Sequence, residues 1–198
     1  MKRKVAISLM VTGILFISLA IGFLFFNEFE NKKAQESSES VVETIRLNIS
    51  ENESKEPIVD PFDEEMKIEE IDGYGYIGYL SIPTLGLELP VMSEWDYSRL
   101  KIAPCRYYGS TKTDNLVIAA HNYKVHFGYL RKLHIGDLVT FTDMDSKIRY
   151  YNVDEVETLM PTDVDKVKDC GDDLILYTCT YGGANRVVVR CSYLQNDF

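Results

Sequence analysis

The N-terminal part of the chain contains a long apolar run, from Val5 to Phe26, that no charged side chain interrupts. A helix rises about 1.5 Å per residue, so about 20 apolar residues cross a hydrocarbon core about 30 Å thick. The run therefore predicts one membrane-spanning helix over residues 5–26. Any chemistry that the chain performs must come from the residues that follow this helix and fold outside the bilayer.

The charges on either side of this run predict its orientation. Three basic residues precede it, whereas Glu28 and Glu30 follow it. Because Lys and Arg are enriched on the cytoplasmic side, we expect residues 1–4 to be a cytoplasmic tail and the chain after Asn27 to lie outside the cell. The alternative is a cleaved signal peptide, whose apolar region has about 7–15 residues and ends at small side chains. The length of the run and its closing phenylalanines favour a retained single-pass anchor in the cell membrane.

The net charge argues against one class of partner. The 198-residue chain has a formal net charge of −10 and carries no basic run beyond its first residues. Binding to nucleic acid requires clustered Lys and Arg that neutralise phosphates. We therefore predict no nucleic-acid partner. The length leaves room for one catalytic domain.

Residues 27–70 differ in composition from the segments on both sides. They are rich in Glu, Ser, Asn and Lys, with scattered apolar residues. Such a segment buries too little apolar surface to offset the entropy lost on ordering. A few apolar residues between Val41 and Leu47 have helical spacing, but so short a pattern carries little weight. We predict an acidic tether that connects the anchor to a domain over residues 71–198.

From Gly73 onward the apolar residues follow the periodicity of strands. Tyr76 to Ile82 is rich in aromatic and β-branched residues, and Leu85 to Val91 alternates apolar with small or polar side chains. Further strand-like stretches cover residues 116–120, 137–142, 147–158, 174–179 and 186–193. Short strands at close spacing, with only brief helical stretches between them, predict an all-β barrel or sandwich. No glycine signature of a nucleotide site is present.

Three reactive side chains stand at the ends of strand-like stretches. His121 ends "LVIAAH", Cys179 ends "LILYTC", and Arg186 begins "RVVVR". Nucleophilic cysteine catalysis needs a thiolate, an imidazole that carries a proton, and a donor that stabilises negative charge on the attacked carbonyl. A side chain at the end of a core strand is held rigidly and is still accessible. These residues are therefore our candidate nucleophile, proton carrier and anion stabiliser.

The order of these segments resembles the sortase family of cysteine transpeptidases. "LILYTC" is similar to the family motif Thr-Leu-x-Thr-Cys, with Ile175 in place of the first Thr. "YIGYLSIPTLGLELPV" looks like the opening strands of a sortase, and "IAAHNYKVHFGYLRKLHIGDLVTFTD" resembles the segment that contains the family's His. The resemblance covers about Tyr76 to Tyr193. It implies a closed eight-stranded β-barrel with short helices, and activity on the outer face of a Gram-positive-type membrane.

The resemblance also implies a role for each candidate. Cys179 would attack the threonine carbonyl of a sorting signal that resembles Leu-Pro-x-Thr-Gly, carried at the C-terminus of a secreted protein, and would form a thioester. His121 would protonate the departing amine and then act on an incoming amine from a cell-wall precursor or a pilin. Arg186, with the backbone N–H of Thr180, would stabilise the oxyanion. Two features differ from those of other sortases. The sequence shows no second, C-terminal apolar span of the kind typical of pilus-building sortases, and the interval from Cys179 to Arg186 is shorter than in many members of the family.

Several neighbouring residues are secondary candidates. Thr178 would support the substrate or the thiol, although a strand threonine is also a common structural residue. Asn122 would orient His121, although Asn after a strand is commonly a turn residue. Arg190 is a rival for Arg186, which we prefer because it lies beside the loop that follows the thiol.

Other features are treated as alternatives. Asp163, Asp165, Asp169, Asp172 and Asp173 could bind calcium, but their spacing is not that of an EF-hand, so we predict no metal site and no required cofactor. The only disulfide that we consider joins Cys170 to Cys191. Asp60-Pro61-Phe62 resembles the lid motif of pilus-building sortases.

Two other functions remain open at this stage. A surface cysteine endopeptidase would share the chemistry up to the thioester and pass its acyl group to water. A tethered binding domain would use its β-rich surface to hold a partner and leave Cys179 inert.

Overall fold

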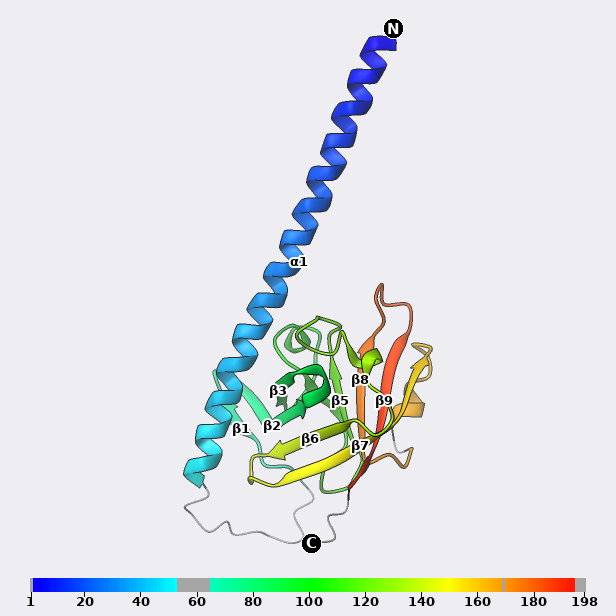
Figure 1. Cartoon of the computed structure of the whole chain (residues 1–198). Helices are drawn as coiled ribbons and strands as arrows, with labels where there is room; N and C mark the ends of the chain where they lie inside the picture. Colours follow the sequence, from blue (N-terminus) through cyan, green and yellow to red (C-terminus); the bar gives the residue numbers. More distant parts are fainter. Residues whose placement is uncertain (1, 53–64, 169, 195–198) are drawn as a thin grey trace. The chain divides into compact units, whose positions relative to one another are not determined.

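The computed structural model describes residues 2–52, 65–168 and 170–194 (Figure 1). Its internal contacts divide the chain into one unit that ends at Lys33 and a second that begins at Ala34. The two units are described separately below.

The first unit consists of the N-terminal part of helix α1, which extends over Lys2–Asn52. Its apolar side chains are exposed around the helix, including Leu9, Phe16 and Phe23. The most apolar window of this helix has a mean hydropathy of 2.5, and none of that window is buried by protein. A helix that is apolar all round and uncovered by protein matches a lipid environment. The finding is compatible with a membrane anchor and with a signal sequence.

Helix α1 differs from the irregular tether that we expected over residues 27–70. It continues without a break to Asn52, and its C-terminal part belongs to the second unit. Val41, Ile45 and Ile49 are four residues apart, so they share one face of the helix, and all three are buried in an apolar cluster with residues of the barrel. This stripe gains enough burial to order the segment, which composition alone did not reveal. The Asp60-Pro61-Phe62 motif lies outside the described residues.

The second unit is built mainly from short strands. Within the described residues, four 3₁₀ turns accompany them: η1 (Pro83–Leu85), η2 (Arg99–Lys101), η3 (Leu130–Lys132) and η4 (Val164–Val167). The strands form one nine-stranded sheet: β1 (Glu69–Ile71), β2 (Tyr74–Ile82), β3 (Leu87–Met92), β4 (Cys105–Tyr108), β5 (Leu116–Ala120), β6 (Leu138–Asp143), β7 (Ile148–Leu159), β8 (Leu174–Cys179) and β9 (Arg186–Tyr193).

The sheet closes into a barrel of eight strands (Figure 1). Its order is β2-β3-β4-β5-β8-β9-β7-β6, and an additional pairing of β2 with β6 completes the ring. Strand β1 pairs with β2 beside this ring. Most neighbours are antiparallel, but β3 is parallel to β4 and β5 is parallel to β8. The predicted closed all-β barrel with short helices is confirmed.

Gly78 makes the closure between β2 and β6 sterically feasible. It lies at a register shift in β2 and has a φ of 143°, which L-residues rarely adopt. A Cβ atom at this position would lie 2.0 Å from the carbonyl oxygen of Thr142 on β6. Only a glycine therefore lets the two strands approach closely here.

The barrel interior is filled with apolar side chains. Alternate residues of each strand face inward, as Leu116, Ile118, Leu174 and Leu176 illustrate in the parallel pair β5–β8. Fully buried Tyr151 is among the largest side chains of this core. Because the interior is packed, a binding site must lie on the outside or at a rim of the barrel.

Candidate active site

The strand pairing brings the three sequence candidates to one edge of the barrel. Ala120 is paired with Thr178 in the parallel ladder of β5 and β8, so His121 and Cys179 are the next residues on neighbouring strands. Cys179 is in turn paired with Arg186 in the antiparallel ladder of β8 and β9. The carboxyl ends of two parallel strands meet at the same edge of a sheet. The fold therefore gathers side chains that are far apart in the sequence.

These three residues line one cavity of 260 Å³. Thr178, which precedes Cys179, lines it as well. The cavity is completed by residues of β4, β5, β8 and the neighbouring loops, namely Trp95, Tyr97, Leu100, Tyr107, Ala119, Ala120, Pro161 and Tyr177. The lining combines an apolar and aromatic wall with a thiol, an imidazole and a guanidinium.

The environments of the four cysteines differ, and all four thiols are free. Cys105 and Cys191 are buried in apolar clusters, and burial raises the pKa of the Cys105 thiol to about 12. Cys170 is exposed, and its Sγ contacts Asp172 at 3.0 Å. Cys179 is half-buried and lines the cavity. The disulfide considered between Cys170 and Cys191 is not formed, because Cys191 faces the barrel core whereas Cys170 faces solvent.

A tight loop follows β5 and holds His121. The ring of His121 lies 5.0 Å from the ring of Tyr123 between centroids, and the His121 carbonyl accepts a 3.2 Å hydrogen bond from the N–H of Phe127. A Cβ atom on Gly128 would lie 2.7 Å from the carbonyl oxygens of Asn122 and Tyr123, so the loop folds closely on itself. The backbone thus limits where the imidazole can lie.

The secondary candidate Asn122 connects this loop to the loop after Cys179. Its Nδ2 donates to the carbonyl oxygen of Thr180 at 3.3 Å. This contact holds the histidine loop against the chain that follows the cysteine.

Both predicted threonines donate hydrogen bonds to backbone carbonyls of the same domain. The Thr178 hydroxyl is buried and donates to the Ala120 carbonyl at 2.8 Å, so it joins β8 to β5 beside His121. The N–H of Thr180 donates to the carbonyl of Asn185 at 2.9 Å. It therefore closes the β8–β9 loop and is not available as the oxyanion donor that we predicted. A tight loop needs such cross-loop hydrogen bonds, and sequence alone did not indicate which N–H would supply them.

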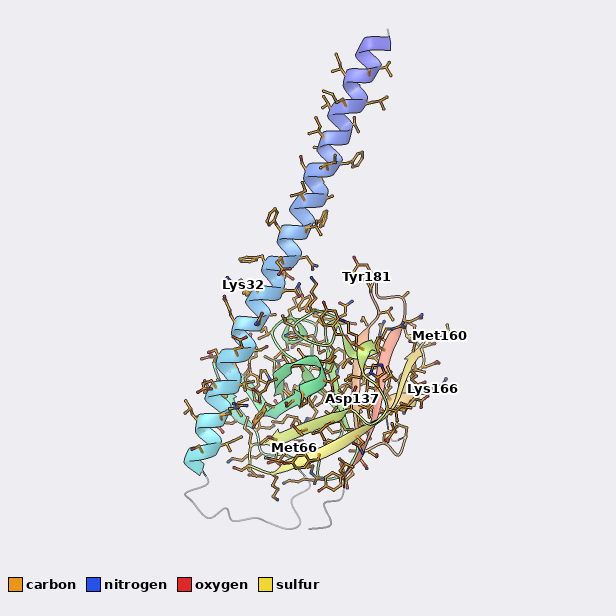
Figure 2. The ribbon with its side chains drawn as sticks, viewed as in Figure 1. Lys32, Met66, Asp137, Met160, Lys166 and Tyr181 are labelled. Atoms are coloured by element: carbon orange, nitrogen blue, oxygen red, sulfur yellow. The ribbon has the colours of Figure 1, made fainter. Side chains whose placement is uncertain are left out.

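The loop closed by Thr180 connects β8 to β9. Tyr181, near its tip, is 100% exposed and projects into solvent (Figure 2).

Arg186 and its rival Arg190 have different surroundings. Arg190 lies opposite Ile175 and forms ion pairs with Glu157 and Asp172. Arg186 lines the cavity, and its Nη1 donates to the carbonyls of Gly183 at 2.9 Å and Asn185 at 3.1 Å. Its Nε donates to the Tyr177 hydroxyl at 3.2 Å. Among the described residues, its Nη2 has no hydrogen-bond partner and is left as an available donor.

A row of aromatic rings forms one wall of the cavity, and sequence reasoning missed it. Tyr97 contacts Trp95, Trp95 contacts Tyr107, and Tyr107 stacks on Tyr177, with centroid separations of 5.8, 5.2 and 5.9 Å. Asp96 lies between Trp95 and Tyr97 in the sequence. Its carboxylate accepts hydrogen bonds from backbone N–H groups at the start of η2, and these bonds lower the pKa of the carboxyl. The one signal in the sequence was the single Trp of the chain within the polar stretch "SEWDYSRL".

The described part of the chain contains no group of three or more His, Cys, Asp or Glu residues that could hold a metal ion. Asp169, one of the acidic residues considered for calcium, lies outside that part.

Comparison with known proteins identifies the family. Residues 80–194 match the family described as the Sortase domain. The chain is 28% identical over 183 residues to Sortase A of Bacillus anthracis, which covers 88% of this chain and 85% of that protein.

Solved structures with the same fold include sortases of several types. Sortase C1 from Streptococcus agalactiae has a TM-score of 0.56 and 25% identity, and covers 84% of this chain and 96% of its own. The Sortase D5 transpeptidase of Clostridium perfringens has a TM-score of 0.62 and 20% identity, and the match covers 81% of this chain and 99% of that chain. Sortase A from Corynebacterium diphtheriae has a TM-score of 0.57 and 20% identity, and the match covers 89% of this chain and 97% of that chain.

A closed barrel of this topology, together with the domain match, defines a cysteine transpeptidase. The chain belongs to the sortase family, because the domain match spans more than half of its length. Sortases act generally on proteins that carry sorting signals. The similar proteins include sortases A, C and D, so their names do not select a subclass.

Proposed function

We propose that this sortase cleaves a C-terminal sorting signal resembling Leu-Pro-x-Thr-Gly on secreted proteins, and joins the new carboxyl end to an amine of a cell-wall precursor or a pilin. The observation that carries the proposal is the register of the strands. It puts Cys179 opposite Arg186 and level with His121 at one open cavity.

In the first half-reaction, the Cys179 thiol passes its proton to His121 as Sγ attacks the threonine carbonyl of the signal, and the π electrons of that carbonyl move to its oxygen. His121 then gives a proton to the departing amine, the C–N bond breaks and a thioester remains. Arg186 supplies a permanent positive charge beside the oxyanion, and its Nη2 is the nitrogen left to donate. These side chains supply nucleophile, proton and cation, so we propose that the reaction requires no metal or cofactor.

In the second half-reaction, an amine attacks the thioester carbonyl. His121 accepts the proton that the amine loses, and the Cys179 sulfur leaves as the C–S bond breaks. The product is an amide that links the two partners. If water replaced the amine, the same thioester would be hydrolysed, and the enzyme would act as an endopeptidase.

The proposal can be tested with the full chain in detergent micelles, a sorting-signal peptide and an excess of a glycine-based amine. Mass spectrometry should detect an acyl adduct on Cys179 and a peptide joined to the amine. Hydrolysed peptide alone, at every amine concentration, would favour the endopeptidase. No cleavage of any peptide in a sorting-signal library would favour a binding domain. Chelator should not change the rate.

We also propose that α1 anchors the enzyme in the cell membrane as a single-pass helix, with residues 1–4 in the cytoplasm and the catalytic domain outside. The exposed apolar surface of the helix over residues 5–26 supports this proposal. Protease added to intact cells should remove the catalytic domain and leave an N-terminal tag protected. An untagged N-terminus in the mature protein would indicate cleavage of a signal sequence instead.

A further inference from the structure

Tyr177 and Arg186 lie diagonally across neighbouring strands on the outer face of the barrel. Tyr177 is two residues before Cys179 on β8, and Arg186 is the direct partner of Cys179 on β9. Side chains two residues apart on a strand share a face, and diagonal neighbours are within reach of long side chains. The Tyr177 hydroxyl consequently meets the Arg186 Nε at 3.2 Å.

The ring of Tyr177 is fixed by its neighbours. It stacks on the ring of Tyr107 at 5.9 Å with an interplanar angle of 14°. Tyr107 is contacted in turn by the ring of Trp95 and by the ammonium group of Lys168, which lies 4.8 Å from its centroid. A ring that is held in this way presents its hydroxyl at a defined point, which an exposed tyrosine such as Tyr181 cannot do.

The contacts of Arg186 show why this hydroxyl matters. Nη1 donates to two carbonyls of the β8–β9 loop, those of Gly183 and Asn185. Both bonds are made by one nitrogen of the guanidinium. The bond from Nε to Tyr177 adds a contact on a second nitrogen, on another edge of the group. Within the described residues, Nη2 alone among the guanidinium nitrogens then has no partner.

The phenol is suited to this task because it is neutral. Burial raises the pKa of Tyr177 above its usual value, against the opposing effect of Arg186. A neutral hydroxyl orients the guanidinium without cancelling its charge, whereas a carboxylate in the same place would form an ion pair and weaken the field at the reacting carbonyl.

We infer that Tyr177 is a positioning residue, which orients the Arg186 guanidinium so that Nη2 is presented to the oxyanion. The inference rests on the proposed role of Arg186 in the reaction. The Tyr177 hydroxyl thus acts through Arg186, and the rings of Tyr107 and Trp95 hold the Tyr177 ring in place.

The test compares Tyr177→Phe with Tyr181→Phe in the full chain in detergent micelles. Tyr177→Phe removes the hydroxyl and keeps the stacked ring, and we expect kcat to fall about 10- to 100-fold with KM changed less than about twofold, because a hydrogen bond to a charged group is lost in the transition state. Tyr181→Phe removes a hydroxyl that faces solvent and should leave kcat unchanged. A kcat of Tyr177→Phe equal to that of wild type would overturn the inference.

A double-mutant cycle separates positioning from a structural role. In an Arg186→Lys background, Tyr177→Phe should cost less than about twofold, because the group that it positions has been replaced. An undiminished loss in that background, or a loss accompanied by a lower Tm, would show that Tyr177 acts independently of Arg186 and would overturn the inference.

A spectroscopic readout follows the contact directly. In ¹⁵N-edited NMR spectra, the Arg186 Nε–Hε signal should be protected from solvent exchange in wild type and lose that protection in Tyr177→Phe. Unchanged protection would contradict the inference. The proposed function has its own test: it is wrong if Arg186→Ala or Cys179→Ala transfers peptide at the wild-type rate. That result does not depend on the behaviour of Tyr177→Phe.

Discussion

Arg186 is the direct antiparallel partner of Cys179, so the guanidinium and the thiol project from facing positions of β9 and β8. Their relative placement is therefore set by a backbone ladder that is continuous from Leu174 to Cys179. Geometry held by strands is more precise than geometry held by loops. The loop between the two residues adds only the carbonyl contacts that hold the guanidinium.

Cys179→Ala should abolish both cleavage and transfer, because no other group can form the thioester. The measurement is a peptide-cleavage assay together with mass spectrometry of the protein after incubation with substrate. Cys170→Ala is the matched control, since it removes an exposed thiol outside the cavity and should leave the rate unchanged. An acyl adduct on any residue of the Cys179→Ala protein would contradict the assignment.

Arg186→Ala and Arg190→Ala should have opposite effects on activity and stability. Arg186→Ala should lower kcat by about 10²-fold or more, as loss of an oxyanion donor commonly does, with little change in Tm. Arg190→Ala leaves the partly buried Glu157 and Asp172 without their cation, and should lower the free energy of unfolding by about 1–3 kcal/mol. Its kcat should stay within about twofold of wild type. Steady-state kinetics and urea unfolding measure the two effects, and an exchange of the two phenotypes would reverse the choice of arginine.

Ile45→Ala should destabilise the catalytic domain even though Ile45 lies in the segment next to the anchor. Its side chain is 0% exposed and packs in the cluster that includes Tyr76 and Met92, so truncation should cost about 2–5 kcal/mol. Leu47→Ala is the control, because Leu47 is 58% exposed and should change stability by less than about 0.5 kcal/mol. Denaturant unfolding of the full chain, followed by a signal from the barrel, gives both values. Equal stabilities of the two variants would mean that α1 does not pack on the barrel.

His126 should make the protein less stable in mild acid. Burial, reinforced by the nearby His121, lowers the pKa of His126 to about 4, whereas a histidine in an unfolded chain has a pKa of about 6.5. Its ring nitrogens are buried and have no hydrogen-bond partner among the described residues. Between about pH 6.5 and pH 4, the unfolded chain binds a proton that the folded chain does not, so the free energy of unfolding falls as the pH falls. The full effect is on the order of 3 kcal/mol.

The measurement is urea unfolding at several pH values in that window. His126→Phe should flatten the fall in stability relative to wild type, because the titrating group is gone. His134→Gln serves as the control, since His134 is exposed and its replacement should leave the slope unchanged. A slope that His126→Phe does not alter would assign the acid sensitivity to other groups.

Several parts of the molecule could be predicted because they depend on neighbours along the chain. The uncharged run from Val5 to Phe26 indicated a long apolar helix, and short apolar runs indicated the strands that end at Ala120 and Cys179. The resemblance in motif order then led to the closed barrel. The buried stripe of α1 was missed, since its three residues are apolar in a polar segment and gain their burial only from a distant surface.

The sequence alone determined at which strand ends the candidate residues His121, Cys179 and Arg186 stand, because side-chain type and local periodicity are properties of short segments. Only the tertiary structure decided that β5 lies parallel to β8, that the Thr180 N–H closes a loop, and that the Tyr177 hydroxyl meets Arg186. These features depend on which strands pair and in what register. Register is selected by the packing of the whole barrel, and no single segment contains that information.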